Sequence, residues 1–275
     1  ALCNYLTSIG YPDTENDKYK KFWPAIHIVG KDILRFHAVY WPAFLMAADI
    51  LPPRKIFAHG WWTNEGQKIS KSLGNVIDPY EIINKYGLDQ IRFFLFREVP
   101  FGNDGDFSKD AIAQRINADL SNKYGNLVHR IASFVVKNSN SLVHKTENII
   151  TEDKSLINFL KERFKEYLIF MEEQQIDKAL KSVFELISKT NSYIDKQSPW
   201  VLKNNNIERM NVVLFIALNI IRCSSLMLMP VVPSSSNKVL DILNINKSER
   251  NFKFIKLILK DVKIVNPTPI FPRID

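Results

Sequence analysis

From residue 108 onward, apolar residues recur at a helical spacing. They return every three or four positions, which places them on one face of an α-helix. The first series consists of Ile112, Ile116, Leu120, Leu127, Val128, Ile131 and Val135. The same spacing predicts further helices at 154–173, 176–196, 207–229 and 234–243, with polar linkers at 137–151 and 203–206. Amphipathic helices joined by polar linkers predict a helix bundle.

Residues 1–107 follow a different pattern, with short apolar runs and four of the five tryptophans. The runs predict strands at 25–29 and 55–59 and helices at 31–48, 79–86 and 89–97. We expect Pro42 to bend the first of these helices. Alternation of strand, helix and strand is typical of an α/β fold. The sequence therefore predicts an α/β domain over 1–107 followed by an all-α domain over 108–275.

The most apolar stretch, 212–232, contains polar residues and ends in a turn with two prolines. A membrane span needs about 20 mostly uncharged apolar residues, so a buried bundle helix is the better interpretation. The two cysteines, Cys3 and Cys223, exclude a disulfide framework and a cysteine-rich zinc site, and favour a reducing intracellular compartment. The net charge of +8 favours a polyanionic partner such as nucleic acid, although many basic proteins bind none.

A loop rich in lysine and serine carries the clearest chemistry. Lys68 and Lys71 lie three residues apart, with Ser70 between them, in a segment bounded by Gly66 and Gly74. Glycines let the loop move, and ammonium groups are compact charges suited to phosphate. Such a loop can neutralise a triphosphate as charge develops on the leaving pyrophosphate. A solvated surface loop is the alternative for so short a motif.

A second group of candidates begins where the strand at 25–29 ends. Gly30 and Asp32 lie at its junction with the next helix, where α/β proteins bind ligands. The alternative for Asp32 is a simple helix N-cap. Ile33, His37 and Trp41 are four residues apart and share one helix face. A histidine among apolar residues is more often a core residue, so that alternative also stays open.

A third group lies in the bundle. Asn126 and Arg130 are four residues apart on one predicted helix, and Trp200 follows a proline. An exposed aromatic ring can stack on an unpaired base, while Asn and Arg can read base edges. On spacing alone, ordinary packing is the favoured alternative for these three residues.

Two strings reveal a family resemblance, HGWW at 59–62 and KISKS at 68–72. They resemble the signature loop of class I aminoacyl-tRNA synthetases, and in detail that of bacterial-type methionyl-tRNA synthetases. The match continues through DP at 78–79, YG at 86–87, REVPFG at 97–102 and DGDFS at 104–108. Ile69 departs from the Met usual in the family. Such an apolar exchange usually costs less than about 1.5 kcal/mol, so we expect the loop to function.

The resemblance implies a fold and a set of site residues. The fold is a partial Rossmann-type nucleotide-binding domain with a signature-loop (stem-contact) region, followed by a helical-bundle anticodon-binding domain. The catalytic residues implied are Lys68 and Lys71. The ATP-binding residues implied are Gly30, Asp32, Lys68, Ser70 and Lys71. Methionine binding is implied for Tyr5, Ile33, His37 and Trp41, and reading of a CAU anticodon for Asn126, Arg130 and Trp200.

The resemblance also implies a reaction, its partners and a location. A cytoplasmic methionine–tRNA ligase activates methionine with ATP and Mg²⁺ to methionyl-adenylate, then transfers methionine to tRNA(Met), with no membrane partner. The family's His-Ile-Gly-His string does not occur in this sequence, and 1–5 resembles the end of the family's Trp-x-Asp-Ala-Leu segment. We therefore expect the C-terminal part of such an enzyme, without bound metal and nearly inactive alone.

Two other interpretations remain. A class I synthetase for leucine, isoleucine, valine or cysteine shares the lysine loop, although the His37 and Trp41 pair and the Trp61-Trp62 string favour methionine. A non-catalytic tRNA-binding module would use only the basic bundle. Methionine binding would separate this module from a synthetase.

Overall fold

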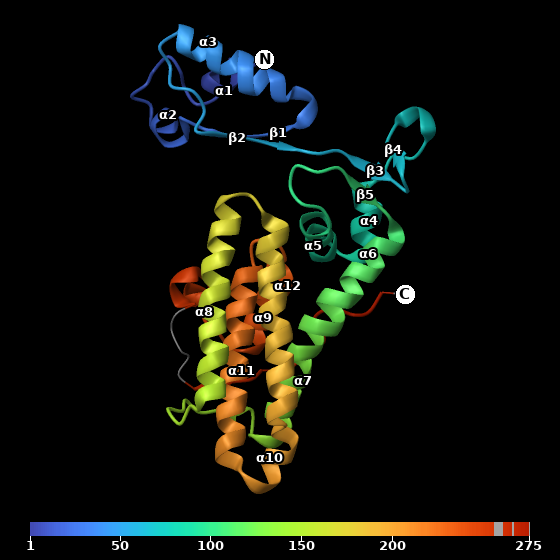
Figure 1. The fold of residues 1–275 in the computed structure, drawn as a ribbon, viewed down its shortest axis with the longest axis vertical. Coiled ribbons are helices and arrows are strands. Elements are labelled where there is room, and N and C mark those ends of the chain that lie inside the picture. The colour runs from blue at the N-terminus through green and yellow to red at the C-terminus, as the bar shows by residue number, and fades with distance from the viewer. Residues whose placement is uncertain (256–260, 266, 275) are drawn as a thin grey trace. The chain divides into compact units, whose positions relative to one another are not determined.

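The computed structural model describes residues 1–255, 261–265 and 267–274, and the chain divides into two compact units. The first unit consists of Ala1–Lys68 and Phe101–Asp106, and the second of Ile69–Pro100 and Phe107–Asp275. The first contains short strands and helices, whereas the second is dominated by long helices (Figure 1). The predicted combination of an α/β part and an all-α part is thereby confirmed. A domain boundary after residue 107 stays a prediction.

In the first unit, a parallel pair of strands adjoins an aromatic core. The elements are α1 (Asn4–Thr7), α2 (Asp17–Phe22), β1 (Ile26–Gly30) and β2 (Lys55–His59). Both predicted strands are present, and they pair in parallel, with His27 opposite Ile56. Alternate residues of β1, His27 and Val29, are buried. The core cluster consists of Leu6, Trp23, Trp41 and Leu45.

The stretch that connects β1 to β2 is helical but irregular. It passes through η1 (Lys31–Ile33), a 3₁₀ turn, then η2 (Phe36–Tyr40), a π-helical turn, and α3 (Trp41–Ala47). Pro42 lies in the first turn of α3, where α3 does not need the missing N–H. The departure from α-geometry thus falls just before the proline, near the position where the sequence predicts a bend.

A small antiparallel sheet follows β2. Its strands are β3 (Trp62–Asn64), β4 (Gln67–Lys68) and β5 (Gly105–Phe107), in the order β4-β3-β5. The turn between β3 and β4 consists of Glu65 and Gly66, both with positive φ, as a type I′ hairpin turn requires. This sheet was not predicted from the sequence, because strands of two or three residues are too short to show an alternating pattern.

The second unit begins with short helices and continues into one long helical stretch. The short elements are η3 (Lys71–Leu73), α4 (Pro79–Tyr86) and α5 (Leu88–Glu98). The long stretch consists of α6 (Lys109–Arg115), the π-helical η4 (Ile116–Gly125) and α7 (Asn126–Asn138). All seven apolar residues that predicted this stretch are buried. The helices predicted at 79–86 and 89–97 are confirmed to within a residue at each end.

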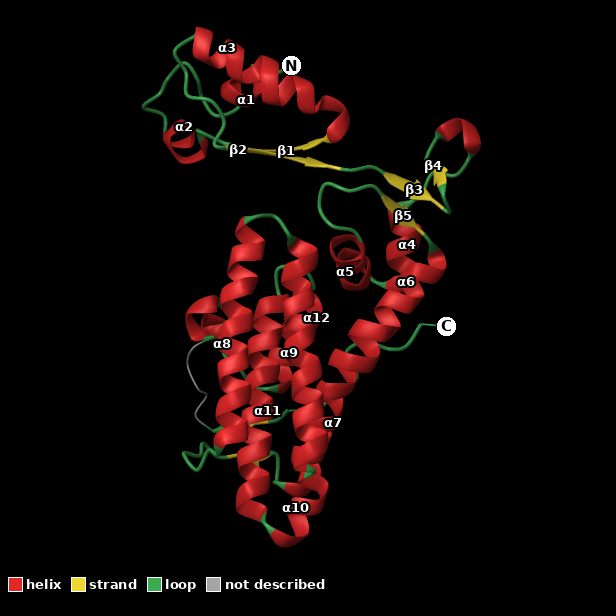
Figure 2. Cartoon of the chain, viewed as in Figure 1, coloured by secondary structure: helices red, strands yellow, loops and turns green. Residues whose placement is uncertain are grey.

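The long helices α8 (Thr151–Glu172), α9 (Ile176–Gln197) and α11 (Ile207–Leu228) pack on one another as a bundle (Figure 2). The shorter helices α10 (Pro199–Asn205) and α12 (Pro233–Ile242) complete it. Within the described residues, α11 is the one helix long and apolar enough to cross a membrane. Because 94% of its most apolar window is buried inside the protein, the predicted buried bundle helix is confirmed.

One predicted linker is wrong and one part of the chain was not predicted. The polar run at 203–206 belongs mostly to α10, because Pro199 starts that helix and only Asn206 separates it from α11. The side chain of Asn206 caps α11 by accepting a hydrogen bond from the Arg209 amide at 2.9 Å. The unpredicted elements after α12 are η5 (Lys247–Glu249), η6 (Phe252–Phe254) and β7 (Val262–Lys263), which pairs antiparallel with β6 (Leu142–Val143).

Candidate active site and RNA-binding surface

Three of the four predicted methionine-binding residues lie together in the first unit. The Tyr5 hydroxyl lies 2.9 Å from His37 Nε2, and the Tyr5 ring centroid is 6.3 Å from that of Trp41. The other ring nitrogen, His37 Nδ1, is 2.9 Å from the Ile33 carbonyl oxygen. A carbonyl oxygen can only accept, so Nδ1 carries the proton, and in the neutral ring Nε2 accepts from Tyr5. These two contacts therefore fix the orientation of the His37 ring and place the proton of Nδ1 toward the Ile33 carbonyl.

Burial divides this group. His37 and Trp41 are buried, whereas Tyr5 and Ile33 are exposed. Of Ile33, the backbone carbonyl takes part in the cluster through His37. Trp41 Nε1 is buried without a hydrogen-bond partner in the described part of the chain. The predicted common face of Ile33, His37 and Trp41 thus includes two buried rings and one exposed aliphatic side chain.

The cluster also contains a residue that the motifs did not indicate. His27 lies in β1, and its ring centroid is 4.5 Å from that of Tyr5 and 5.8 Å from that of His37. Burial lowers the pKa of His27, and the neighbouring His37 lowers it further. The sequence pattern gave no signal for His27, because the apolar Ile26 and Ile28 beside it are the exposed residues of β1.

The predicted ribose-binding pair lies where β1 meets η1. The N-cap of η1 is Gly30, and Asp32 lies inside the turn, so capping does not explain Asp32. The Asp32 carboxylate folds back over Gly30, and a Cβ added to Gly30 would overlap Asp32 Oδ1. Asp32 is exposed. An exposed carboxylate and a glycine therefore lie at the carboxyl end of a parallel strand, where α/β proteins bind ligands.

Two aspartates of the DGD string hold the neighbouring segments in place. Asp104 accepts hydrogen bonds from Lys31 Nζ at 2.6 Å and from the Trp61 amide at 2.8 Å, and both donors lower its pKa. Lys31 Nζ also lies 4.4 Å from the Trp61 ring centroid. A Cβ at Gly60 would overlap the Asn103 carbonyl oxygen, so only glycine permits this crossing of the two segments.

The second aspartate ties the hairpin that leads into the lysine loop. Asp106 Oδ1 accepts from Thr63 Oγ1 at 2.5 Å and from the Gly66 amide at 2.7 Å. Lys68, at the end of this hairpin, is exposed on β4. The structural role of the DGD string at 104–106 was not predicted from the sequence. The two carboxylates on either side of Gly105 were the one sequence feature that could have indicated that they hold neighbouring segments together.

The lysine loop contains the short η3 turn and two hydrogen bonds that involve Ser70. The Ser70 amide donates to Asn75 Oδ1 at 2.9 Å, and the hydroxyl groups of Ser70 and Ser72 are 2.6 Å apart. Gly74 has φ near +65° with no atom close to where a Cβ would stand, so its positive φ is the reason for glycine. The side chain of Lys71 lies outside the described residues. Its predicted role in catalysis therefore stays a prediction.

Two of the three predicted anticodon-binding residues lie side by side in the second unit. The Arg130 guanidinium is 6.0 Å from the Trp200 ring centroid, and Trp200 is 40% exposed. Arg130 donates to Asp195 Oδ1 at 2.8 Å and to Asn191 Oδ1 at 3.1 Å. These two α9 residues orient the guanidinium beside the ring. Sequence spacing could not indicate them, because about sixty residues separate them from Arg130.

Asn126 lies one helical turn before Arg130 and is exposed. It lines a separate shallow groove between the start of α7 and the C-terminal segment, together with His129 and Arg273. Asn117 fixes that segment by exchanging two hydrogen bonds with the Ile274 backbone at 2.7 and 2.9 Å. Asn126 is therefore available to a ligand, but it is not held in the Arg130–Trp200 contact.

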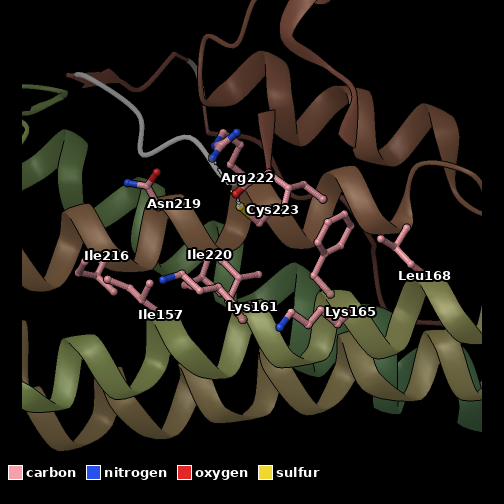
Figure 3. Close-up of a pocket in the computed structure, with 12 residues that line it drawn as sticks. Ile157, Lys161, Lys165, Leu168, Ile216, Asn219, Ile220, Arg222 and Cys223 are labelled. Atoms are coloured by element: carbon pink, nitrogen blue, oxygen red, sulfur yellow. Dashed lines mark hydrogen bonds between the residues drawn. The ribbon is translucent and has the colours of Figure 1, made fainter. Parts of the chain in front are cut away.

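An apolar cavity of about 420 Å³ lies elsewhere in the bundle, between α8 and α11 (Figure 3). Lys161 and Lys165 of α8 line it, and so does the buried Cys223 of α11. None of the site residues predicted from the sequence lines it. The residues described also contain no group of three or more His, Cys, Asp or Glu side chains placed to hold a metal ion.

Two family models match successive parts of the chain, with a short gap between them. Residues 1–132 match the class I tRNA synthetases (M), and residues 143–274 match the anticodon-binding domain of methionyl tRNA ligase. The chain belongs to the methionyl-tRNA synthetase family. This excludes the leucine, isoleucine, valine and cysteine enzymes as the family of origin.

Individual synthetases of the family support the assignment. The chain is 48% identical to the methionine–tRNA ligase of Rickettsia felis and 42% identical to that of Brucella suis, and it spans 55% and 53% of their lengths. A solved structure of Mycobacterium tuberculosis methionyl-tRNA synthetase in complex with methionyl-adenylate superposes with a TM-score of 0.94 at 40% identity. That superposition covers 99% of this chain and 55% of the other. The chain thus spans about half the length of the relatives it matches.

Proposed function

We propose that the protein containing this chain is a cytoplasmic methionine–tRNA ligase. It would activate methionine with ATP to methionyl-adenylate, release pyrophosphate and transfer methionine to tRNA(Met). The observation that carries the proposal is the Tyr5–His37–Trp41 cluster, in a chain whose sequence matches methionyl-specific family models. By itself this chain should be nearly inactive in adenylate formation.

The amino-acid pocket would recognise methionine through its aromatic rings. A thioether sulfur makes favourable contacts with aromatic edges about 5 Å away. The exposed Tyr5 ring can offer such an edge and the exposed Ile33 an aliphatic wall, while the buried His37 and Trp41 rings lie next to Tyr5. His37, oriented by Tyr5 and by the Ile33 carbonyl, adds a polar group beside the aromatic rings. The pocket would therefore select an uncharged, polarisable side chain.

The adenylation chemistry needs positioning and charge neutralisation rather than a covalent intermediate. Gly30 and Asp32 would hold the ribose, because the carboxylate can accept hydrogen bonds from two hydroxyl groups. Lys68, Ser70 and Lys71 would bind the phosphates of ATP, which enters with Mg²⁺ as substrate. As the bond to the α-phosphate breaks, Lys71 would stabilise the charge that develops on pyrophosphate, with Lys68 assisting.

The bundle would read the CAU anticodon. The exposed Trp200 ring offers a stacking platform, and Arg130, held beside it by Asp195 and Asn191, can donate to base edges. Asn126 would contribute its side-chain amide, two N–H donors and one oxygen acceptor, from the preceding turn of α7. The bundle would thus provide recognition of the tRNA, while the first unit and the lysine loop bind the small substrates.

The test uses a chimaera in which this chain replaces the matching part of the Rickettsia felis enzyme. Pyrophosphate exchange should depend on methionine and not on leucine, isoleucine, valine or cysteine. Lys71→Ala should slow single-turnover adenylate formation by roughly 10²–10³, the scale for loss of one transition-state donor, with methionine affinity nearly unchanged. Lys18→Ala, on the exposed helix α2, is the matched control. An unaltered rate in Lys71→Ala would refute its catalytic role.

A further inference from the structure

A second groove in the bundle has charge that the proposed reaction does not use. It has a volume of about 430 Å³ and lies between η4 and α9, with one residue each from α5 and α8. Its cationic lining residues are Arg97, Lys123, Lys181 and Lys189, and its acidic ones are Asp119 and Glu185. Cations therefore outnumber acids along the groove.

Both acidic groups already have partners. The Asp119 carboxylate is 4% exposed and lies 2.7 Å from Lys123 Nζ, 3.4 Å from Arg115 Nη1 and 3.8 Å from Arg97 Nε. Glu185 pairs with Arg163 at 2.9 Å. The carboxylates thus organise the basic side chains around them and are not available to attract a cationic ligand.

Three cations remain incompletely compensated. Lys181 and Lys189 are exposed and form no ion pair with any residue that the structure describes. Arg97 Nε is buried and makes no hydrogen bond within the described residues. Burial lowers the pKa of Arg97, and the neighbouring Arg115 lowers it further, so an added anion would stabilise its charged form. The groove is therefore suited to a negatively charged ligand.

Asn191 of α9 links a residue of the groove to the Arg130–Trp200 contact. Asn191 accepts a hydrogen bond from Arg130, and its Nδ2 donates to the Lys123 carbonyl oxygen at 3.4 Å. Lys181 and Lys189 are eight residues apart on the same face of α9, a separation of roughly 12 Å. Cations spread along a helix match a row of phosphates better than one small anion, which needs donors that converge on a point.

We propose that this groove binds the phosphodiester backbone of the anticodon stem while Trp200 and Arg130 engage the anticodon loop. This inference rests on the proposed function, because it assumes that the bundle binds tRNA. Lys181, Lys189 and Arg97 contact phosphates, and the exposed hydroxyl groups of Ser188 and Ser192 lie on the same lining. Such contacts fix the register of the RNA and carry no base specificity.

The test compares two double variants of the whole chain. Lys181→Ala/Lys189→Ala removes the groove lysines, and Lys161→Ala/Lys165→Ala removes two exposed α8 lysines at the other cavity (Figure 3). Binding is measured for a CAU anticodon stem-loop, a stem-loop with a mismatched anticodon, and the loop sequence without a stem, each at several salt concentrations. Trp200→Ala is measured in parallel.

The groove variant should bind both stem-loops about tenfold more weakly, the scale for two lost charge contacts. Its slope of log affinity against log salt should be shallower by roughly 1.5, as expected for two fewer phosphate contacts. Binding of the stemless RNA should change little. The α8 variant should retain affinity and slope on all three RNAs.

Three results would overturn the proposal that the groove binds the stem: unchanged RNA affinity in the groove variant, a loss of affinity confined to the CAU stem-loop, or an equal loss of affinity in the α8 variant. Failure of the proposed anticodon recognition has a different pattern. In that case Trp200→Ala would affect both stem-loops equally, whatever the groove variant does. Failure of the unaltered chain to bind either stem-loop would overturn both proposals.

Discussion

The two units bury their apolar residues to very different extents. In the second unit, 18 of the 22 residues of α11 are buried, as expected for a helix at the centre of a bundle. The core cluster of the first unit consists of four residues, and many of its large apolar side chains are exposed. These include Phe22, Ile26, Ile28, Phe36, Phe44 and Met46. We therefore infer that the second unit is the more stable of the two.

The difference in burial indicates how substitutions should act in each unit. The second unit encloses buried polar groups such as Asp153, which is stable there because Arg209 and Tyr193 donate to it. The first unit instead presents polar and aromatic groups at a junction of strand and helix, where they are available to ligands. Substitutions in the second unit should therefore act mainly on stability, and substitutions at its surface or in the first unit's cluster mainly on binding.

The largest effect is expected from Asp153→Ala in the bundle. The buried Asp153 carboxylate accepts from Arg209 at 2.6 and 2.8 Å and from the Tyr193 hydroxyl at 2.6 Å. Removing it leaves Arg209 without its partner, which should cost roughly 3–5 kcal/mol of unfolding free energy. Urea unfolding followed by helical circular dichroism reports mainly this unit. Tryptophan fluorescence reports mainly the first unit, which contains four of the five tryptophans.

Asp195→Ala is the matched control, because its ion pair with Arg130 is exposed and such pairs contribute about 0.2–1 kcal/mol. Equal losses in the two variants would contradict the assignment of Asp153 as a buried stabilising group. Burial alone would raise the pKa of Asp153, but hydrogen bonds from Arg209 and Tyr193 lower it below its usual value. Its contribution should therefore be present above about pH 4 and decline as the pH falls further.

Trp200→Ala should affect RNA binding rather than stability. Trp200 is 40% exposed, so little packing is lost when the ring is removed. Loss of one stacking platform should weaken binding of a CAU stem-loop by roughly 1–3 kcal/mol, about tenfold to a hundredfold. The loss should be much smaller for a stem-loop already mismatched at the anticodon. If circular dichroism showed a large loss of stability and both RNAs lost affinity equally, Trp200 would be a packing residue.

Most of the second unit could be predicted from the sequence, because each long helix carries its own repeating pattern. Proline and asparagine also mark helix starts there, as at Pro79 and Asn206. The exceptions were α10, whose polar asparagines suggested a linker, and the short elements after α12. The two π-helical stretches were not predicted, because a π-helix is a rare local departure inside an α-helix and no sequence pattern was available for it.

The candidate sites were predictable only where a motif or a helical spacing joined the residues. That was true of Tyr5, His37 and Trp41 through the family resemblance, and of Arg130 with Trp200. It was not true of His27 or Asn191, which reach these clusters through tertiary packing alone. No local pattern records that kind of proximity, since the partners come from separate elements.

The smallest effect concerns the histidine that the motifs missed. His27 has a pKa lowered by burial and by His37, so the folded first unit favours its neutral form. Its contribution to stability is therefore complete above the unfolded value near pH 6.5 and is lost progressively as the pH falls below it. His27→Gln should make the fluorescence-detected unfolding of the first unit less sensitive to pH between about 7 and 5. The change should be smaller than the loss in Asp153→Ala, because only part of one ionisation is involved.

The dichroism-detected transition of the second unit should keep its pH dependence in this variant. If the fluorescence transition of His27→Gln retained the full slope of the unaltered chain, another group would be responsible for that slope, and His27 would contribute to the cluster through its ring contacts and not through its ionisation.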